Sequence, residues 1–207
     1  MRIGYGVCVG SWDKLQRWVL PHTAGRPLVA LAGQTAITAA YNTILDAYQD
    51  ADLDALILQH DDLELVDPAG EGKLVDAVLD PAVALAGVAG GGSDAGLAWW
   101  NQTPIGHQQT DAMVIDFGQR AGDVQALEGS VLTFGRWAIG NLRFDERFPG
   151  FHGYDVDICR TAWNLGKRVV VVDVDTWHHN SMGFKSEDSH GEWLECDRVH
   201  RGKQGLV

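Results

Sequence analysis

The stretch "TAITAAYNTILDAYQDADLDALILQHDD", residues 35–62, contains both kinds of element that decide the fold. Its first half carries apolar side chains at helical spacing, at Ile37, Ala40, Tyr41, Ile44, Leu45 and Tyr48. This period predicts a helix over residues 35–51, with Thr35 as its N-cap. The segment "DALILQHDD", residues 54–62, predicts a strand that follows this helix directly. Helices alternating with buried strands are typical of an α/β sheet.

Further strands and helices alternate on both sides of this unit. The expected strands lie at residues 3–9, 27–33, 83–92 and 167–175, with a strand pair or bent strand at 124–135. The expected helices lie at residues 10–22, 71–79 and 153–166. Residues 93–123 are too polar and too rich in turn residues for an assignment. The pattern predicts a single α/β domain with a mainly parallel sheet over residues 1–183, followed by a polar tail over 184–207 that could act as a flap.

The chain has 207 residues and a net charge of −12, with a sequence pI of about 4.9. This balance opposes binding to the phosphate backbone of nucleic acids or to anionic lipid. The three cysteines are widely spaced, which argues against a disulfide framework or a structural zinc site. No apolar run reaches the roughly 18 residues of a membrane helix, and the N-terminus lacks the apolar region of a signal peptide. We therefore expect a cytoplasmic protein.

Polar side chains gather where the predicted strands end. They are Ser11 after the first strand, Gly33 and Gln34 after the second, His60, Asp61 and Asp62 after the third, and His178 and His179 near the last. In parallel sheets, ligands bind outside the carboxyl ends of the strands. The adjacent carboxylates of Asp61 and Asp62 repel each other, and a divalent cation would offset that repulsion. The sequence therefore predicts a metal site here, with a solvated acidic strand end as the alternative.

A second constellation is "FHGYDVDICRTAW", residues 151–163. Gly153 interrupts the chain before the helix, so Asp155 falls in the first turn, where the helix dipole favours a carboxylate. One interpretation makes Asp155 a helix cap. The functional interpretation is a general base at the edge of a pocket, with Asp157 and His152 nearby.

A third constellation is "DTWHHNSMG", residues 175–183. Successive side chains of a strand point to opposite faces, so His178 and His179 are expected on different sides if the strand continues. One of the two could ligate a metal. A structural role is the alternative for each.

Taken in order, these segments resemble a glycosyltransferase of the GT-A fold, family 2-like. Residues 35–62 are similar to the family's helix and the acidic D-x-D motif that follows it. Residues 127–179 are similar to its acceptor half, most specifically from "FDE" through "GYDVDIC" to "NLGKRV". The resemblance covers roughly residues 1–183. It implies a nucleotide-binding βα half followed by an acceptor half, in one GT-A-type domain.

The resemblance implies a metal held at the end of the third strand, either Mn²⁺ or Mg²⁺. Asp61 matches the last aspartate of the D-x-D motif, which binds the metal on the diphosphate of the donor. The first aspartate of that motif falls on Gln59, so either Asp62 substitutes for it or the metal is held more weakly. His178 or His179 matches the histidine that completes the metal shell, and the pattern "H-x-S-x-G" favours His179.

The resemblance also implies an inverting enzyme that moves a hexosyl or similar sugar from a nucleoside diphosphate sugar to an acceptor hydroxyl. Asp155 matches the catalytic base of inverting members, and Asp157 matches the acidic residue after it. His152 is the third candidate for the catalytic group. A base and a divalent metal are what a direct displacement of a nucleoside diphosphate needs.

The donor and the acceptor are expected at different parts of the sequence. The residues expected to bind the donor are Ser11, Gln34, Asn42, Gln59, His60 and Asp61. Many relatives have an aspartate for the nucleoside after the second strand, whereas this chain has Gly33-Gln34-Thr35, so the nucleobase and the sugar stay open. Trp99 and Trp100 are expected in or beside the acceptor groove, where aromatic rings stack on sugar faces, with ordinary packing as the alternative.

Two other functions compete with the transferase. A metal-dependent phosphoesterase or other hydrolase also suits His and Asp at strand ends, and it predicts turnover without an acceptor. A non-catalytic sugar- or nucleotide-binding module is compatible with Gln59 in place of the motif's first aspartate, and it predicts donor binding without release of nucleoside diphosphate. The expected acceptor is a glycan, a protein or a small molecule rather than a nucleic acid.

Overall fold

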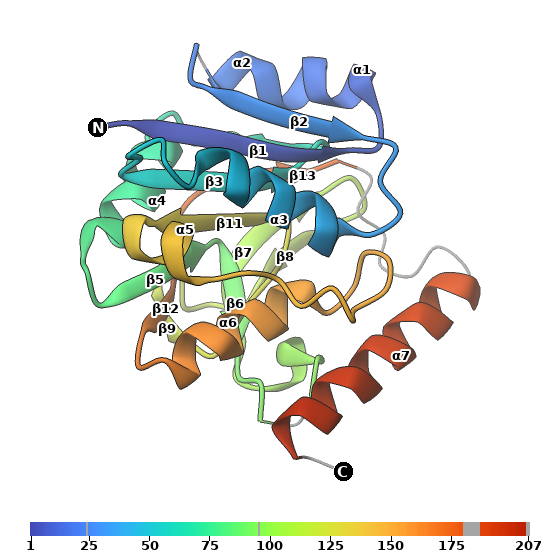
Figure 1. The fold of residues 1–207 in the computed structure, drawn as a ribbon. Helices are drawn as coiled ribbons and strands as arrows, with labels where there is room; N and C mark the ends of the chain where they lie inside the picture. Colours follow the sequence, from blue (N-terminus) through green and yellow to red (C-terminus); the bar gives the residue numbers. More distant parts are fainter. Residues whose placement is uncertain (24, 95, 180–186, 206–207) are drawn as a thin grey trace.

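The fold is built on a seven-stranded sheet with the order β2-β1-β3-β11-β5-β12-β9 (Figure 1). The computed structural model describes residues 1–207 except 24, 95, 180–186 and 206–207. In sheet order, the strands are Leu28–Ala32, Ile3–Val9, Ala55–His60, Val131–Gly135, Val83–Gly87, Arg168–Val171 and Gly122–Val124. Each expected strand therefore has a counterpart, although the predicted strand 167–175 ends early, at Val171.

Most strands of this sheet run in one direction. Strand β1 pairs in parallel with β2 and β3, and β12 pairs in parallel with β5. Strand β11 is antiparallel to both β3 and β5, so β5 has the direction of β3. The edge strand β9 is antiparallel to β12. The predicted mixed, mainly parallel α/β sheet is confirmed, and β11 begins at the edge where β1 and β3 end.

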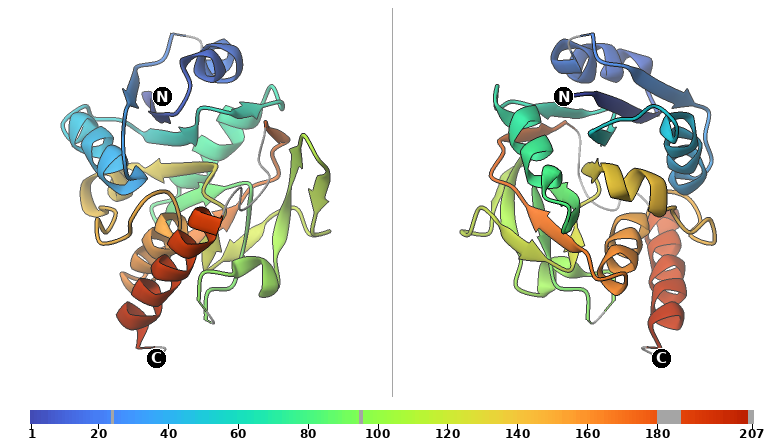
Figure 2. Two further views of the ribbon diagram at one scale, coloured as in Figure 1. Left: turned by 90° about the vertical axis from the view of Figure 1, so that its right-hand side faces the viewer. Right: turned by 60° about the vertical axis from the view of Figure 1, so that its left-hand side comes forward.

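Helices cover both faces of the large sheet (Figure 2). On one face lie α3, α5 and α6, which span Ile37–Tyr48, Arg136–Asn141 and Tyr154–Asn164. On the other face lies α4, Gly70–Leu79, together with a bent helical segment made of α1 (Trp12–Lys14), the π-helical turn η1 (Leu15–Val19) and α2 (Leu20–Thr23). The two faces thus enclose separate apolar clusters, as a doubly covered sheet requires.

Helix α3 packs unusually close to β1 because β1 presents glycine to it. A Cβ on Gly6 would lie 2.5 Å from a side-chain carbon of Ile44, so only a residue without a side chain fits there. The helix begins at Ile37 with Ala36 as its N-cap, not with Thr35. The difference has a tertiary cause, since the amide of Ile37 donates to the carbonyl of Gly150, 2.9 Å away. The carbonyl of Gly150, in a loop distant in sequence, thus satisfies a helix-terminal amide that the expected Thr35 side chain would have capped.

A second, six-stranded sheet lies beside the first, with the order β10-β6-β7-β13-β4 and with β8 paired to β7. Its strands are Ala126–Leu127, Ala89–Gly91, Ile105–Thr110, Thr176–His178, Leu63–Leu65 and Val114–Asp116. A short 3₁₀ turn, η2 (Trp99–Asn101), lies between β6 and β7 in the chain. Part of the unassigned region 93–123 is therefore regular. Strand β7 does not show the alternation of apolar and polar residues expected of a strand, since several of its buried side chains are polar. Hydrogen-bond partners make this burial possible: Nε2 of His107 lies 2.6 Å from Oδ1 of Asp175.

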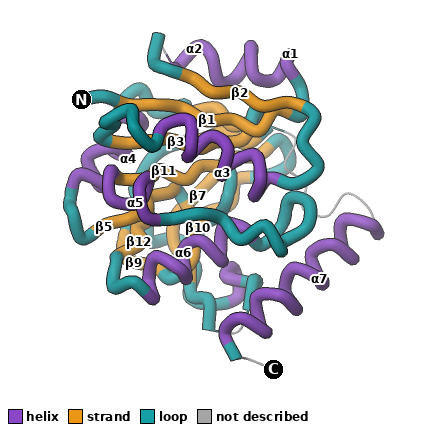
Figure 3. Tube along the Cα trace, viewed as in Figure 1, coloured by secondary structure: helices purple, strands orange, loops and turns teal. Residues whose placement is uncertain are grey.

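The described part of the predicted tail is a long helix, α7, which spans Glu187–Gln204 (Figure 3). It is anchored by Trp193, Cys196 and Val199, which pack with Leu97 and Phe148 in one apolar cluster. Residues 184–186 and 206–207 of that predicted tail lie outside the described residues. Among the described helices, none has the length and apolar character needed to cross a membrane.

Candidate active site

A cavity of about 930 Å³ lies at the edge where β1 and β3 end. Most of the polar residues that line it come from the ends of β1 and β3, from the chain before β11, from the first turn of α6 and from β13; the others are Gln34 after β2, Gln108 of β7 and His152 before α6. Register explains this meeting: Cys8 of β1 lies beside His60 of β3, and the amide of His60 donates to the carbonyl of Ser130. The predicted strand-end site and the predicted helix-start site therefore face one cavity.

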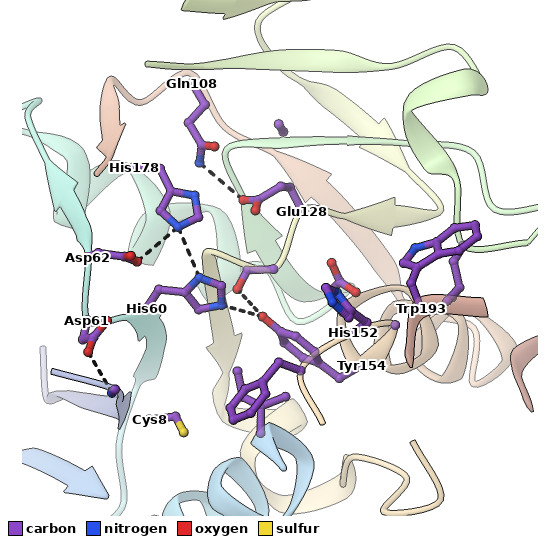
Figure 4. Close-up of a pocket in the computed structure, with 18 of the residues that line it drawn as sticks. Cys8, His60, Asp61, Asp62, Gln108, Glu128, His152, Tyr154, His178 and Trp193 are labelled. Atoms are coloured by element: carbon purple, nitrogen blue, oxygen red, sulfur yellow. Dashed lines mark hydrogen bonds and ion pairs between the residues drawn. The ribbon is translucent and has the colours of Figure 1, made fainter. Parts of the chain in front are cut away.

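Three side chains in this cavity form a candidate metal centre (Figure 4). His60 Nδ1 lies 3.4 Å from His178 Nε2, which lies 3.2 Å from Asp62 Oδ1. Neighbouring ligands of an octahedral ion, at about 2.1 Å from the metal, are separated by about 3 Å. Two imidazole nitrogens and one carboxylate oxygen at these separations fit a divalent transition metal.

The charge of Asp62 is stabilised by two neighbours. Its Oδ2 accepts a hydrogen bond from Lys14 Nζ at 2.9 Å, and its Oδ1 faces His178. Burial raises the pKa of the Asp62 carboxyl, but the hydrogen bonds from His178 and Lys14 outweigh burial and hold that pKa well below its usual range. Burial lowers the pKa of His178 and the bond to Asp62 raises it, with a net increase. Asp62 is thus an anion at neutral pH, as a metal ligand must be.

Asp61 is oriented differently from Asp62. Its Oδ2 accepts the backbone amides of Gly10 and Ser11, at 2.8 and 2.6 Å. The side chain therefore joins the end of β3 to the loop after β1, and it also lines the cavity. Whether Asp61 ligates the metal stays a prediction, since the cluster of His60, Asp62 and His178 forms without it.

Asp155 lines the same cavity from the first turn of α6. The pKa of its carboxyl is raised to about 7. Burial raises this pKa most, the amide of Val156, which donates to Oδ1 at 2.9 Å, lowers it, and the charge of Glu128 raises it. A pKa near the working pH is what a general base requires. The helix N-terminus behind it favours the charged form.

The other two predicted catalytic residues lie apart from each other. His152 lines the cavity, 3.9 Å from Glu192 of α7, and burial lowers the pKa of its imidazole. Asp157 is buried on the far side of α6, where its Oδ2 pairs with Lys203 Nζ at 2.7 Å. Asp155 and Asp157 are two residues apart in a helix, so they cannot share a face.

The residues predicted to bind the donor are only partly brought together. Gln34, His60 and Asp61 line the cavity, and Ser11 adjoins it through its amide bond to Asp61. Asn42 instead fastens α3 to the backbone of Phe144, and Gln59 is fully buried on the other face of β3. Strand alternation places Gln59 and His60 on opposite faces, which removes Gln59 from the cavity.

His178 and His179 point to different places, as strand alternation predicts. His178 is in the metal cluster, whereas His179 is stacked between Trp18 and Trp177, with ring centroids 3.6 and 4.9 Å away. Its Nε2 lies 3.0 Å from Glu64 Oε2. The structure therefore places His178, not His179, in the cavity. Ser181 and Gly183 of the "H-x-S-x-G" pattern lie outside the described residues.

Sequence reasoning did not single out Glu128 or Tyr154. Glu128 precedes β11, and its Oε2 accepts the amide of Ser130 at 3.0 Å and faces Gln108. Tyr154 is the residue before Asp155, and its hydroxyl lies 2.8 Å from His60 Nε2. The sequence signal for Tyr154 was its place beside Asp155 in the run "GYD". Glu128 had no such signal, because it reaches the cavity only through the antiparallel pairing of β11 with β3.

Aromatic side chains line the side of the cavity away from β1. They are Trp99 and Trp100 of η2, Phe117, Phe151 and Trp193 of α7. Trp99 is buried and packs edge-on to Trp100, while Trp100 is 41% exposed and lies 6.2 Å from Trp193. Both tryptophans singled out in the sequence thus face the cavity.

The sequence matches one established family over most of its length. The profile of the glycosyltransferase-like family matches residues 5–193. Streptomycin biosynthesis protein StrF of Streptomyces griseus is 36% identical over 194 residues, which cover 88% of this chain and 68% of that protein. The chain belongs to the glycosyltransferase-like family.

Solved structures with low sequence identity to this chain share its fold. GalNAc-T7, crystallised with UDP, GalNAc and Mn²⁺, has a TM-score of 0.59 at 12% identity, over 87% of this chain and 43% of that one. The mannosyltransferase PcManGT of Pyrobaculum calidifontis, in complex with GDP-Man and Mn²⁺, has a TM-score of 0.55 at 13% identity, over 99% of this chain and 64% of that one. A197 from STIV has a TM-score of 0.59 at 14% identity, over 86% and 85%.

The expected identification as a family 2-like glycosyltransferase of the GT-A fold is confirmed. Family and fold together define a glycosyltransferase. The identities to the solved structures are too low to transfer a donor, a metal or an acceptor.

Proposed function

We propose that this protein is an inverting, metal-dependent glycosyltransferase that uses a nucleoside diphosphate sugar. The observation that supports this best is the meeting of a metal-ligating cluster and a carboxylate with a pKa of about 7 in one cavity. A direct displacement needs these two groups on the same reacting centre, one for the leaving group and one for the acceptor hydroxyl.

The donor is expected at the β1 and β3 end of the cavity. His60, Asp62 and His178 would hold the divalent ion there, and a bound ion stabilises negative charge on the departing diphosphate. Two imidazoles favour Mn²⁺ over Mg²⁺, which prefers oxygen ligands. Asp61 keeps the loop after β1 in place by accepting two backbone amides, and Gln34, which lines the cavity, would contact the nucleoside.

Asp155 is the proposed base. Its carboxylate would take the proton of the acceptor hydroxyl as that oxygen attacks the anomeric carbon from the side opposite the leaving group. Burial, together with the charge of Glu128, keeps the pKa of Asp155 high, so that the carboxylate is a competent proton acceptor at neutral pH. His152 lies in the same cavity and is the alternative base.

The acceptor is expected along the aromatic side, against Trp100 and Trp193, whose rings can stack on sugar or other flat faces. Its class is a small molecule or a glycan rather than a nucleic acid. Similarity to a streptomycin biosynthesis protein supports a small-molecule acceptor. The negative charge of the chain opposes a polyphosphate acceptor.

The test is a panel of nucleoside diphosphate sugars with Mn²⁺, assayed for nucleoside diphosphate release with and without candidate acceptors. Acceptor-dependent release with inversion of the anomeric centre, read by NMR, supports the proposal. Release that never depends on an acceptor indicates a hydrolase, and binding without release indicates a binding module. Comparing Asp61→Ala with Asp62→Ala in Mn²⁺ titrations decides which carboxylate carries the metal.

A further inference from the structure

The hydroxyl of Tyr154 connects the metal cluster to the helix that carries Asp155. Tyr154 is the first residue of α6 and is buried. Its hydroxyl oxygen lies 2.9 Å from the carbonyl oxygen of Gly129 and 2.8 Å from His60 Nε2 (Figure 4). The other ring nitrogen of His60, Nδ1, is the one that faces His178.

These two contacts determine where the proton of His60 lies. A carbonyl oxygen only accepts hydrogen bonds, so the hydroxyl proton of Tyr154 must point to Gly129. The hydroxyl oxygen then accepts a hydrogen bond, and its donor is Nε2–H of His60. In a neutral imidazole one nitrogen carries the proton and the other a lone pair, so Nδ1 presents its lone pair to the cluster.

Packing keeps the hydroxyl in this position. The ring of Tyr154 lies edge-on to Tyr41, with centroids 5.8 Å apart, and lies beside Phe144 at 6.0 Å. Gly129 leaves the space that the hydroxyl fills, since a Cβ there would lie 2.4 Å from the hydroxyl oxygen. The tyrosine therefore cannot turn its hydroxyl elsewhere without moving α6 or the chain before β11.

We propose that Tyr154 is a positioning residue that fixes the tautomer of His60 and so makes His60 the third protein ligand of the metal, beside Asp62 and His178. This inference rests on the metal site of the proposed function. It gives α6 two roles, because one helical turn holds the metal ligand through Tyr154 and places the base through Asp155. Partners of this kind typically change metal affinity by 10- to 100-fold.

The test compares Tyr154→Phe with Tyr41→Phe in the full-length protein. Both remove one hydroxyl from the same buried aromatic cluster, and no partner is recorded for the Tyr41 hydroxyl among the described residues. Mn²⁺ affinity is measured by the electron paramagnetic resonance of free Mn²⁺, with and without UDP and GDP. We expect Tyr154→Phe to weaken Mn²⁺ binding by about 10- to 100-fold, and Tyr41→Phe to leave it within about twofold.

A second measurement does not depend on the variant folding. Long-range ¹H–¹⁵N correlation spectra of the metal-free wild type at pH 8, assigned with His60→Gln, report which nitrogen of His60 is protonated. The expected signature is the Nε2–H tautomer. The Nδ1–H tautomer would overturn the inference, because the lone pair would then face Tyr154.

The remaining outcomes separate the inference from the proposed function. Equal Mn²⁺ affinity of folded Tyr154→Phe and wild type overturns the role of Tyr154 and leaves the metal site standing. A wild type that binds no Mn²⁺, with or without nucleotide, overturns the metal site and the inference with it. Equal weakening by Tyr154→Phe and Tyr41→Phe assigns the effect to packing and also overturns the inference.

Discussion

At the scale of single residues, Asp155 and Asp157 offer a matched comparison. The first faces the cavity and the second is buried against α7, yet both belong to the same turn of α6. We expect Asp155→Asn to fold and to lose about a hundredfold to ten-thousandfold in turnover, since a positioned base is removed. Donor and metal affinity should stay near wild type. Turnover by steady-state assay and binding by calorimetry check both parts.

The matched variant is Asp157→Asn, which weakens the ion pair with Lys203. It should lower the melting temperature while each folded molecule keeps most of its activity. Wild-type turnover in folded Asp155→Asn protein would contradict the assignment of the base. His152, which lines the same cavity, would then be the candidate for the base.

The pKa of Asp155 also predicts a pH dependence. The base acts in its deprotonated form, so turnover should rise with pH through about 7 and level off above it. Stability should change in the opposite direction. The native pKa lies above the ordinary value of 3.8, so this carboxyl stabilises the fold fully below pH 3.8 and loses that contribution as the pH rises through about 7. Rate profiles and melting curves between pH 5 and 8.5 test both signs.

Asp155→Asn is the control for this pH dependence. The variant has no ionisable group at the position, so the limb near pH 7 should disappear from both profiles. A limb that persists unchanged in the variant would show that another group titrates there.

Residue types at strand ends and helix starts were predictable because they follow local rules. The cluster His60–Asp62 follows an apolar run, and Asp155 follows a glycine at a helix start. Glu128 was not predictable, because the same residue would lie at the opposite edge if β11 ran parallel to β3. The choice between His178 and His179 likewise depended on where β13 lies and ends, since His178 is its last residue and lines the cavity, whereas His179 follows the strand.

At the scale of elements, α7 shows where local pattern fails. The tail looked like a polar segment because α7 presents only a narrow apolar stripe, of which Trp193, Cys196 and Val199 pack against the domain. Instead, Lys203 of this helix pairs with a buried and a partly buried carboxylate: its Nζ lies 2.7 Å from Oδ2 of Asp157 and 2.9 Å from Oδ2 of Asp145. Composition alone cannot separate a helix docked by ion pairs from a solvated tail.

The docking of α7 leads to a stability prediction. The side chain of Asp157 is 3% exposed and that of Lys203 is 24% exposed. Removing one partner of a fully buried pair costs about 3–5 kcal/mol, so Lys203→Met should cost less, about 2 kcal/mol, because water reaches the lysine. Urea unfolding measures this change. In the Lys203→Met background, adding Asp157→Asn should cost little more, since the charge left unpaired is removed.

Arg198→Met is the control in the same helix. Arg198 pairs with Glu195 within α7 on the exposed side, so its loss should leave the unfolding midpoint nearly unchanged. If Lys203→Met were as neutral as Arg198→Met, the ion pair would not anchor the helix. Because Trp193 of α7 lines the cavity, Lys203→Met should also raise the KM for the acceptor more than the KM for the donor.

At the scale of the whole molecule, the proposed site for the metal and the nucleotide lies where four strands meet: the ends of β1 and β3, the start of β11, and β13. A ligand that binds there ties both sheets and α6 together in the native state only. Mass action then stabilises the fold by about 2.7 kcal/mol at a ligand concentration 100 times the Kd. For a chain of 207 residues this corresponds to a rise in melting temperature of about 5–10 °C.

We therefore expect the correct nucleoside diphosphate with Mn²⁺ to raise the melting temperature by several degrees, and EDTA to remove most of the increase. Asp62→Asn should lose the metal-dependent part, because Asp62 is the one carboxylate of the metal cluster. The control is Asp123→Asn, which alters an exposed ion pair between Asp123 of β9 and Arg168 of β12. This variant should keep the full shift in melting temperature. A full Mn²⁺-dependent shift in Asp62→Asn would contradict the ligand set of His60, Asp62 and His178 and would favour Asp61 as the carboxylate ligand. The absence of a shift with any nucleotide would contradict donor binding in this cavity.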